Sequence, residues 1–299
     1  MKVVLFCGGY GMRMRDGTSD TPKPMAMIGS RPLLWNVMRY YAHFGHTEFI
    51  LCLGYGAKHI KDYFLNYEET LSNDFVLRDG GRDIELLSRD ISGWTITFAQ
   101  TGMETPIGER LRRVRDHLGD DEMFLANYAD VLTDLPLDEM IETFAAGDAA
   151  ATMLAVRPQA AFHAIEYGDD HRISAVETIS EMNLRQNGGY FVMRREVLDA
   201  LDEGDDLLTD TLVRLSKEGK VAAHPYDGFW MPADSVKERA QLENMHNRGH
   251  RPWALWDRDR FDCQQPRGDM ERRRTPDRRR VERPSGGGRR KWDATARVS

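Results

Sequence analysis

A glycine-rich loop near the N-terminus carries the residues best suited to binding phosphate. Gly8, Gly9 and Gly11 follow a short apolar run, Arg13 comes next, and Lys23 stands between two prolines ten residues after the arginine. Glycines let backbone N–H groups approach phosphate oxygens closely. A guanidinium matches those oxygens with a planar fork, and a lysine adds a point charge. The loop therefore predicts a phosphorylated ligand.

The loop alone does not identify a class of enzyme. It contains neither the Walker pattern G-x-x-x-x-G-K-[ST] nor G-x-G-x-x-G, and two glycines after a strand are equally consistent with a simple tight turn. Asp130 is a second candidate, because it ends an apolar run at the place where open α/β sheets bind their ligands. A carboxylate there is also consistent with a helix N-cap.

Apolar periodicity defines the elements that must hold these residues. Short apolar runs predict strands at 2–7, 48–53, 94–99, 123–128, 150–156, 188–193 and 221–224. Helical spacing predicts helices at 32–43, 57–67, 108–118, 137–146, 209–217 and 236–247. Alternating strands and helices predict an α/β fold, with a Rossmann-like, mostly parallel (mixed) sheet flanked by helices. The strand-rich stretch after residue 158 predicts a smaller second lobe.

Charge divides the chain into an acidic body and a basic tail. Residues 248–299 hold 16 basic and 8 acidic residues, whereas the rest holds 25 basic and 40 acidic ones. The tail has few aliphatic residues, which predicts disorder. It is consistent with a nucleic-acid arm or with a solvated extension; the lack of interleaved aromatics and the acidic body argue against nucleic acid. The two tryptophans at 251–256 are expected to pack on the body or on a partner subunit.

The hydropathy and the cysteine content of the chain indicate the cellular compartment in which it works. The chain has no run of 18 apolar residues, so the sequence predicts no membrane span. Its three cysteines, Cys7, Cys52 and Cys263, are odd in number and far apart. This pattern favours a reducing, cytoplasmic location over a disulfide framework.

The pattern GG-x-G-x-R followed by PKPM resembles the sugar-1-phosphate nucleotidyltransferases, and among them the glucose-1-phosphate cytidylyltransferases. Residues 51–64, 101–111, 128–130, 187–191 and 227–234 match that family in order and spacing. The resemblance covers residues 1 to about 243 and implies one domain, 1–247. Its nucleotide-binding part would be about 1–157 and its sugar-binding part about 158–247, with the tail at 248–299 outside. It also implies a homo-oligomer.

The resemblance implies transfer of a nucleotidyl group from an NTP, most closely CTP, to a sugar 1-phosphate, with release of pyrophosphate. Gly8, Gly9, Gly11 and Met12 would cradle the nucleotide and its phosphates. Arg13 would hold the leaving pyrophosphate. Such a reaction depends on positioning and charge neutralisation rather than on covalent catalysis.

The resemblance also assigns the remaining charged candidates. Lys23 would neutralise charge on the reacting phosphates, and Asp130 with Asp234 would bind Mg²⁺, a hard cation that prefers oxygen ligands. Gly108 and Arg110 fall in a segment that lines the nucleotide site. Arg110 is equally consistent with one more solvated charge on a basic helix.

Three residues are implied to contact the sugar. Asn187 would bond its hydroxyls, Gly188 would let it approach, and Glu166 would be an acidic contact. Glu166 is equally consistent with a solvated carboxylate.

Four positions depart from the family pattern. Met12 replaces a threonine, Thr178 replaces a lysine that meets the sugar phosphate, Glu109 replaces a glycine and adds an acid near the nucleotide, and His163 replaces a glycine. Either the acceptor differs from glucose 1-phosphate, or another cation substitutes, or activity is low. His163 is one candidate cation or else a plain loop histidine. A catalytically weak homologue acting as a sugar-nucleotide sensor or scaffold is therefore the alternative function.

Overall fold

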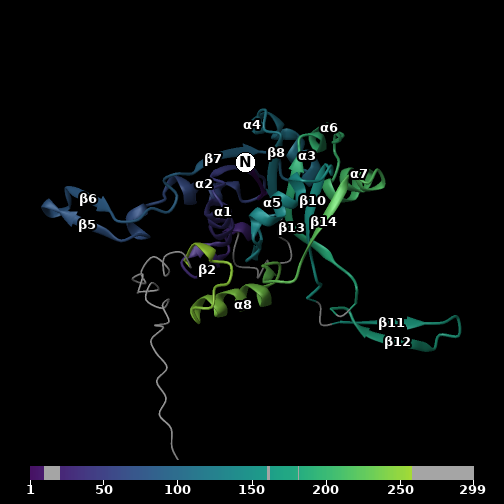
Figure 1. The fold of residues 1–299 in the computed structure, drawn as a ribbon. Helices are drawn as coiled ribbons and strands as arrows, with labels where there is room; N and C mark the ends of the chain where they lie inside the picture. The colour runs from purple at the N-terminus through teal and green to yellow at the C-terminus, as the bar shows by residue number, and fades with distance from the viewer. Residues whose placement is uncertain (10–20, 160–161, 181, 258–299) are drawn as a thin grey trace, which may run out of the picture. The chain divides into compact units, whose positions relative to one another are not determined.

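The structure is a computed structural model that describes residues 1–9, 21–159, 162–180 and 182–257. The candidates Gly11, Met12 and Arg13, together with Cys263 and the predicted tail from residue 258, lie outside these ranges. A central sheet has the strand order β14-β10-β13-β8-β1-β4-β7 (Figure 1). Its strands are β1 (Val3–Phe6), β4 (Glu48–Leu53), β7 (Thr95–Gln100), β8 (Met123–Asn127), β10 (Ala151–Val156), β13 (Gln186–Arg194) and β14 (Val221–Tyr226).

Most neighbouring strands of this sheet are parallel. The pairs β1–β4, β1–β8, β4–β7 and β10–β14 run parallel, and β13 is antiparallel to both β8 and β10. The predicted mixed, mostly parallel sheet is confirmed. The strands after residue 158 differ from the expected separate lobe, because β13 and β14 join the central sheet. Of the described strands after residue 158, β11 (His163–Tyr167) and β12 (Ile173–Thr178) pair with each other in a separate hairpin.

Helices cover both faces of the sheet. They are α1 (Leu33–His43), α2 (Ala57–Leu65), α3 (Ile107–Arg113), α4 (Arg115–Leu118), α5 (Leu137–Ala145), α6 (Glu196–Asp199), α7 (Val213–Lys217) and α8 (Val236–Asn247). The single helix predicted at 108–118 is broken at Val114, where φ is −100° and ψ is 7°. Among the described residues, none of the helices has the length and hydropathy that a membrane span requires.

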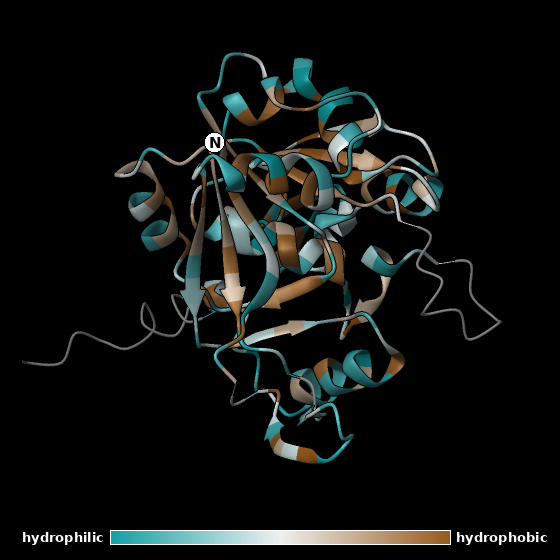
Figure 2. Cartoon of the chain, turned by 90° about the vertical axis from the view of Figure 1, so that its right-hand side faces the viewer, coloured by the Kyte–Doolittle hydropathy of each residue, from teal (hydrophilic) through white to brown (hydrophobic). Residues whose placement is uncertain are grey.

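Strand β1 shows why its sequence is apolar without alternation. Val3 and Leu5 pack into a core that includes α1 and α5, whereas Val4 and Phe6 pack into a second core with α3 and α4. A strand that is buried on both faces needs apolar residues at every position. Hydrophobic residues accordingly gather in the middle of the body (Figure 2).

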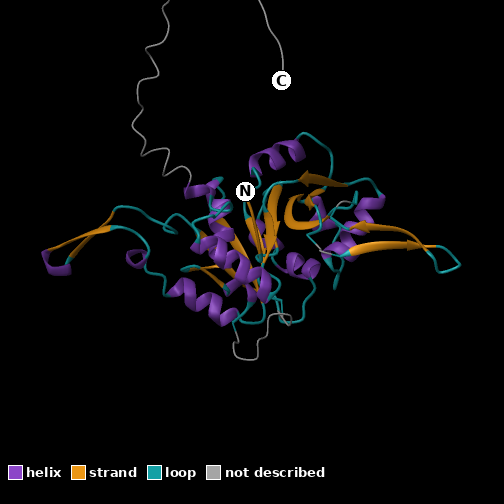
Figure 3. Cartoon of the chain, turned by 90° about the horizontal axis from the view of Figure 1, so that it is seen from below, coloured by secondary structure: helices purple, strands orange, loops and turns teal. Residues whose placement is uncertain are grey.

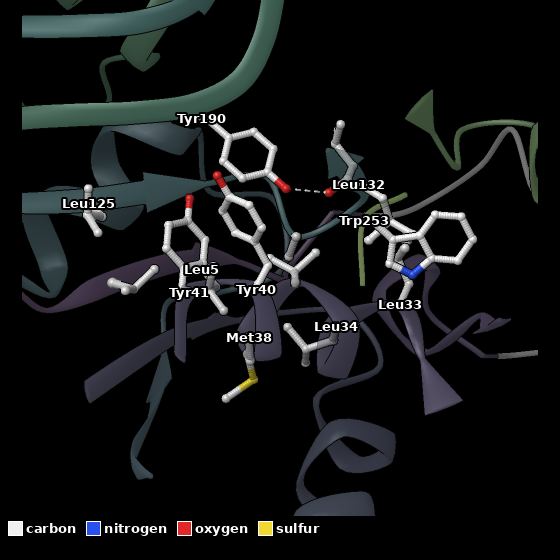
Figure 4. Close-up of a cluster of buried hydrophobic side chains, with 14 of the residues drawn as sticks. Leu5, Leu33, Leu34, Met38, Tyr40, Tyr41, Leu125, Leu132, Tyr190 and Trp253 are labelled. Carbon is white, nitrogen blue, oxygen red and sulfur yellow. Dashed lines mark hydrogen bonds between the residues drawn. The ribbon is translucent and has the colours of Figure 1, made fainter. Parts of the chain in front are cut away.

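Three tyrosines pack where α1 meets the sheet (Figure 4). The rings of Tyr40 and Tyr190 meet edge to face at 5.5 Å, and Tyr41 lies 5.8 Å from Tyr190. The Tyr190 hydroxyl donates to the carbonyl of Val131 (2.9 Å), and the Tyr40 hydroxyl donates to that of Leu135 (2.7 Å). These bonds satisfy buried polar groups and fix the segment that follows β8.

The packed body continues past residue 247. Trp253 is 1% exposed, and its indole N–H donates to Asn36 Oδ1 at 3.3 Å. Trp256 meets Trp35 edge to face at 5.8 Å. Both tryptophans of the 251–256 segment therefore pack on the body, which is one of the two positions expected from the sequence.

Two hairpins stand apart from the central sheet (Figures 1 and 3). One is β11–β12, and the other pairs β5 (Phe75–Arg78) with β6 (Asp83–Leu86), which the sequence did not predict. Each carries facing apolar pairs that are largely exposed; these are Leu77 with Ile84, Ile165 with Val176, and Tyr167 with Ile173. An isolated two-stranded hairpin with an open apolar face is marginal in water.

Candidate active site

Two short strands bring the predicted carboxylates together. β9 (Val131–Thr133) pairs antiparallel with β15 (Trp230–Pro232), so that Val131 faces Pro232. The N–H of Ala233 donates to the carbonyl of Asp130 at 2.9 Å. Asp130 precedes one strand and Asp234 follows the other, so this pairing places the two carboxylates side by side.

Ala129 makes the turn that presents Asp130. Its φ is +63°, in the left-handed region that a residue with a Cβ rarely occupies. The side chain of Asn127, which is fully buried, accepts a hydrogen bond from the Ala129 N–H at 2.7 Å. Such a conformation costs about 1–3 kcal/mol and persists only where the surroundings enforce it. The backbone is therefore strained immediately before the candidate metal ligand.

Lys23 forms an ion pair with one of the two carboxylates. It lies in a short 3-10 turn (Lys23–Met25), and its Nζ donates to Asp234 Oδ1 at 2.7 Å. Removal from solvent and the neighbouring carboxylate of Asp234 raise the pKa of Asp130 well above its usual value, and the charge of Lys23 opposes that rise. Repulsion of this kind is what a bound cation relieves.

The donor chemistry of the pair fits Mg²⁺. Both ligands are carboxylates, and among the residues that the structure describes no group of three or more His, Cys, Asp or Glu forms a metal cluster. Mg²⁺ is commonly held by one or two carboxylates plus water and substrate phosphate oxygens. The donor set of Asp130 and Asp234 therefore fits a magnesium ion of this kind.

A cavity of about 390 Å³ opens beside Asp130. It lies at the carboxyl ends of β1 and β8, where ligands of open α/β sheets bind. The predicted nucleotide-side residues Gly8, Gly9 and Arg110 line it together with Tyr128. The structure therefore brings these four residues and the metal candidate Asp130 into one cavity, which we call the nucleotide cavity.

Arg110 is buried in the wall of this cavity, so a solvated position on the helix face is wrong. Only 4% of the residue is exposed, and burial lowers its pKa from the usual value. All five of its N–H groups donate to the chain. The acceptors are Thr105 O (2.9 Å), Thr101 Oγ1 (2.8 Å), Leu53 O (3.4 Å), Gly8 O (3.1 Å) and Met103 O (3.1 Å). Arg110 gives the cavity positive charge but no remaining donor.

Gly8 and Gly108 have packing roles. A Cβ on Gly8 would lie 2.1 Å from Arg110 Nη1, and one on Gly108 would lie 2.6 Å from the carbonyl of Asp205. Gly8 therefore admits the guanidinium against the loop, and Gly108 lets α3 contact the chain at 205–207. Gly108 is not among the residues that line the nucleotide cavity.

Glu109 does not bring an acid to the nucleotide, contrary to the expectation from its replacement of a glycine. Its side chain is 5% exposed and accepts from Arg112 Nε (2.6 Å) and Arg113 Nε (2.8 Å). The hydrogen bond from Arg112, followed by that from Arg113, lowers the pKa of Glu109 to about 2, although removal from solvent opposes this. The carboxylate is neutralised by two arginines, and Glu109 is not among the residues that line the nucleotide cavity.

Tyr128 links the nucleotide cavity to the predicted sugar residues. Its hydroxyl accepts from Asn187 Nδ2 at 2.9 Å, and Asn187 Oδ1 accepts from the N–H of Gly189 at 2.9 Å. Gly188 packs against Leu154, and its carbonyl accepts from the indole N–H of Trp230 at 2.8 Å. Sequence reasoning read only the aspartate of the Tyr128–Asp130 segment and missed the tyrosine.

Glu166 lies elsewhere. It is exposed on β11, facing Ala175 of β12, and is not among the residues described as lining the nucleotide cavity. His163 faces Thr178 across the same hairpin and is also exposed. Sequence reasoning also missed a cluster of Arg157, Arg185 and Asp227; the only signal was the presence of cations close to the predicted sugar strand.

The sequence as a whole matches one protein family. A family model described as "Nucleotidyl transferase" matches residues 2–234, which is most of the chain. The chain therefore belongs to the nucleotidyl transferase family, and the family assignment made from its motifs is confirmed.

Two individual relatives with curated names indicate a narrower activity than the family model does. The chain is 36% identical over 258 residues to a protein of Bacillus subtilis named "Probable glucose-1-phosphate cytidylyltransferase", covering 86% of this chain and 100% of that protein. It is 34% identical over 260 residues to the glucose-1-phosphate cytidylyltransferase of Salmonella typhimurium, again covering 86% of this chain and 100% of the relative.

A solved structure of similar fold is the UTP-bound UGPase of Acinetobacter baumannii, with a TM-score of 0.61. It is 15% identical, with 88% of this chain and 99% of that chain covered. At this identity the likeness concerns the fold.

Proposed function

We propose that the protein transfers a cytidylyl group from CTP to a sugar 1-phosphate. A phosphate oxygen of the sugar 1-phosphate forms a bond to the α-phosphorus of CTP. The bond between that phosphorus and the bridging oxygen to the β-phosphate breaks, and pyrophosphate leaves. Relatives at 34–36% identity over nearly the whole body support this reaction and the choice of CTP.

The carboxylate pair beside the nucleotide cavity is the observation that carries the proposal. Asp130 and Asp234 are suited to hold Mg²⁺, which when bound would neutralise the phosphate oxygens around the reacting phosphorus. Lys23 is held beside Asp234 by its hydrogen bond, so its charge would stabilise a phosphate bound to the same metal ion. The loop of Gly8 and Gly9 would contact the nucleotide, and the roles of Gly11, Met12 and Arg13 stay predictions.

On the acceptor side, Asn187 is the residue that we assign to sugar hydroxyls. Its amide is oriented by two hydrogen bonds, one to Tyr128 and one from Gly189. Gly188 stays a predicted close contact of the sugar, and Glu166 would need the β11–β12 hairpin to approach the site.

We also propose that the protein is a homo-oligomer in which further copies cover the hairpin faces. Exposed apolar clusters on a globular body commonly mark interfaces. Light scattering after size exclusion tests this, and replacing Ile165 and Val176 with serine should lower the measured mass.

Buried free thiols at Cys7 and Cys52 support the predicted reducing, cytoplasmic setting.

The decisive experiment measures pyrophosphate release with Mg²⁺, each of four NTPs and a panel of sugar 1-phosphates. Asp130→Asn should abolish turnover while leaving the fold intact, and Asp120→Asn, at an exposed position, is the matched control. Turnover by the wild type with CTP and one sugar 1-phosphate is the expected result. CTP binding by calorimetry without turnover of any pair would instead favour the sensor or scaffold.

A further inference from the structure

Three adjacent strands end at the same level on the acceptor side of the sheet. Val156 of β10 faces Gln186 of β13 and also Tyr226 of β14. One residue further on, the chain carries Arg157, Arg185 and Asp227. Two cations therefore stand at the ends of the neighbouring antiparallel strands β10 and β13, and one carboxylate stands at the end of β14.

The two arginines share that single carboxylate. Arg157 Nε donates to Asp227 Oδ1 at 3.0 Å, Arg185 Nη1 lies 2.9 Å from the same oxygen, and Arg185 Nη2 donates to Oδ2 at 3.1 Å. Arg185 Nη1 also donates to the carbonyl of Tyr226 at 2.9 Å. Both terminal NH2 groups of Arg157 make no hydrogen bond to any residue that the structure describes. The cluster carries one uncompensated positive charge.

Two members of this cluster, Arg157 and Asp227, line a second cavity of about 370 Å³, and Arg185 reaches it through its ion pair with Asp227. Arg157, Gln159, Ser180, Asp227 and Trp230 are among its lining residues. The Arg157 and Arg185 side chains are 53% and 27% exposed, so a ligand can reach them.

The second cavity adjoins the residues that we assign to the sugar. Trp230 lines it and donates to the carbonyl of Gly188. Arg185 immediately precedes β13 and is two residues from Asn187, so in an extended chain the two side chains point to the same side, about 7 Å apart. A hexose held by Asn187 would bring its substituents within reach of the arginines.

We propose that Arg157 and Arg185 bind an anionic group of the acceptor sugar. This assignment rests on the proposed transferase activity and supplies a cation on the acceptor side, where Thr178 stands in place of the family's lysine. Two guanidinium groups that share one carboxylate can bind a second anion, because their remaining N–H groups can donate charge-assisted hydrogen bonds to it. The anion is either the reacting phosphate or a second acidic group on the sugar.

The test compares acceptor KM in Arg157→Gln and Arg185→Gln, with Arg172→Gln as a control on the exposed hairpin arginine. The acceptors are glucose 1-phosphate and glucuronic acid 1-phosphate, with CTP and Mg²⁺. Arg157→Gln is the cleaner variant, because it loses a bond only to Asp227. We expect acceptor KM to rise about tenfold or more while the KM for CTP changes less than about twofold.

A rise with both acceptors identifies the anion as the reacting phosphate, and a rise with glucuronic acid 1-phosphate alone identifies a second acidic group. Asp227→Asn should act in the opposite direction and lower acceptor KM, because it removes the competing carboxylate; a purely structural cluster would not give this sign. Wild-type turnover with acceptor KM unchanged in both arginine variants would overturn this assignment alone. Absence of wild-type turnover would contradict the proposed function and this assignment together.

Discussion

Arginine is used differently on the two sides of the sheet. On the nucleotide side, Arg110 is 4% exposed and donates all five N–H groups to the chain. On the acceptor side, Arg157 and Arg185 are more exposed and divide one carboxylate between them. A saturated, buried guanidinium holds a cavity wall in shape, whereas an exposed and incompletely compensated one is available to a ligand.

The difference indicates where substrate choice can vary. The nucleotide cavity is built around hydrogen bonds that connect Gly8, the end of β4 and the segment 101–105, so any change at Arg110 disturbs several segments at once. The acceptor cluster sits at three strand ends and can change without disturbing the core. Substitutions on the two sides should therefore separate into stability effects and substrate effects.

The largest effect is expected at Arg110. Arg110→Lys keeps the charge but loses the planar fork, so the carbonyls of Gly8, Met103 and Thr105 cannot all keep the donor that they now share. The free energy of unfolding should fall by about 3 kcal/mol, and the KM for CTP should rise. Urea denaturation measures the first and pyrophosphate release the second. Arg115→Lys, at an exposed ion pair, should change stability by less than about 0.5 kcal/mol. Equal effects of the two variants on stability would contradict the structural role assigned to the buried Arg110.

Two neighbouring glycines provide a sharper test. Gly8→Ala puts a Cβ 2.1 Å from Arg110 Nη1, whereas a Cβ on Gly9 meets no atom of the described residues within 4 Å. Gly8→Ala should destabilise the fold by about 2 kcal/mol, because the guanidinium must move and lose bonds. Thermal unfolding should show little change for Gly9→Ala. Similar melting temperatures for both variants would show that the wall is not tightly built around Arg110.

Tyr128 tests the connection between the two sides. Tyr128→Phe keeps the ring in the nucleotide cavity and removes the hydroxyl that accepts from Asn187. The loss corresponds to about 1 kcal/mol, so the KM for the sugar 1-phosphate should rise about fivefold. The KM for CTP should stay within about twofold. A larger change for CTP than for the acceptor would contradict the role of Asn187 in sugar binding.

The smallest effect concerns the pH dependence of stability. Glu109 has a pKa of about 2 in the folded state, below its usual 4.5, because Arg112 and Arg113 hydrogen-bond its carboxylate. Its contribution is therefore complete above about pH 4.5 and is lost as the pH falls toward 2. Glu109→Gln should cost about 1 kcal/mol at pH 7 and flatten the acid limb of the unfolding curve. Glu122→Gln, at an exposed position, should leave that limb unchanged.

The sequence predicted the parts of the fold that hydrophobic burial determines. Strand β4 and helix α8 have the predicted bounds, because the first is buried on both faces and the second begins at the capping serine Ser235. The hairpin β5–β6 was missed because its apolar residues face solvent and no core pattern marks it. The break at Val114 was missed for a different reason, because the buried apolar positions Leu111, Val114 and Leu118 continue across it.

The candidate site was predictable only in part. The glycine loop and the resemblance pointed to Gly8, Gly9 and Asp130, and the structure brings these into one cavity. The pairing of Asp130 with Asp234 depends on two three-residue strands, which are too short to give a periodic signal. The saturation of Arg110 depends on carbonyls from distant segments, and every residue has a carbonyl, so no sequence pattern identifies them.

The β11–β12 hairpin leaves the sheet after Val156 and returns at Gln186, and these two residues face each other on adjacent antiparallel strands. The register of the sheet is thus independent of how long the excursion between them is. Evolution can therefore lengthen, shorten or exchange this insertion as a module while Asp130 and Asp234 stay in place. Arg157 and Arg185 stand at its two ends, so on the proposed assignment they are the first positions at which a new acceptor would be selected.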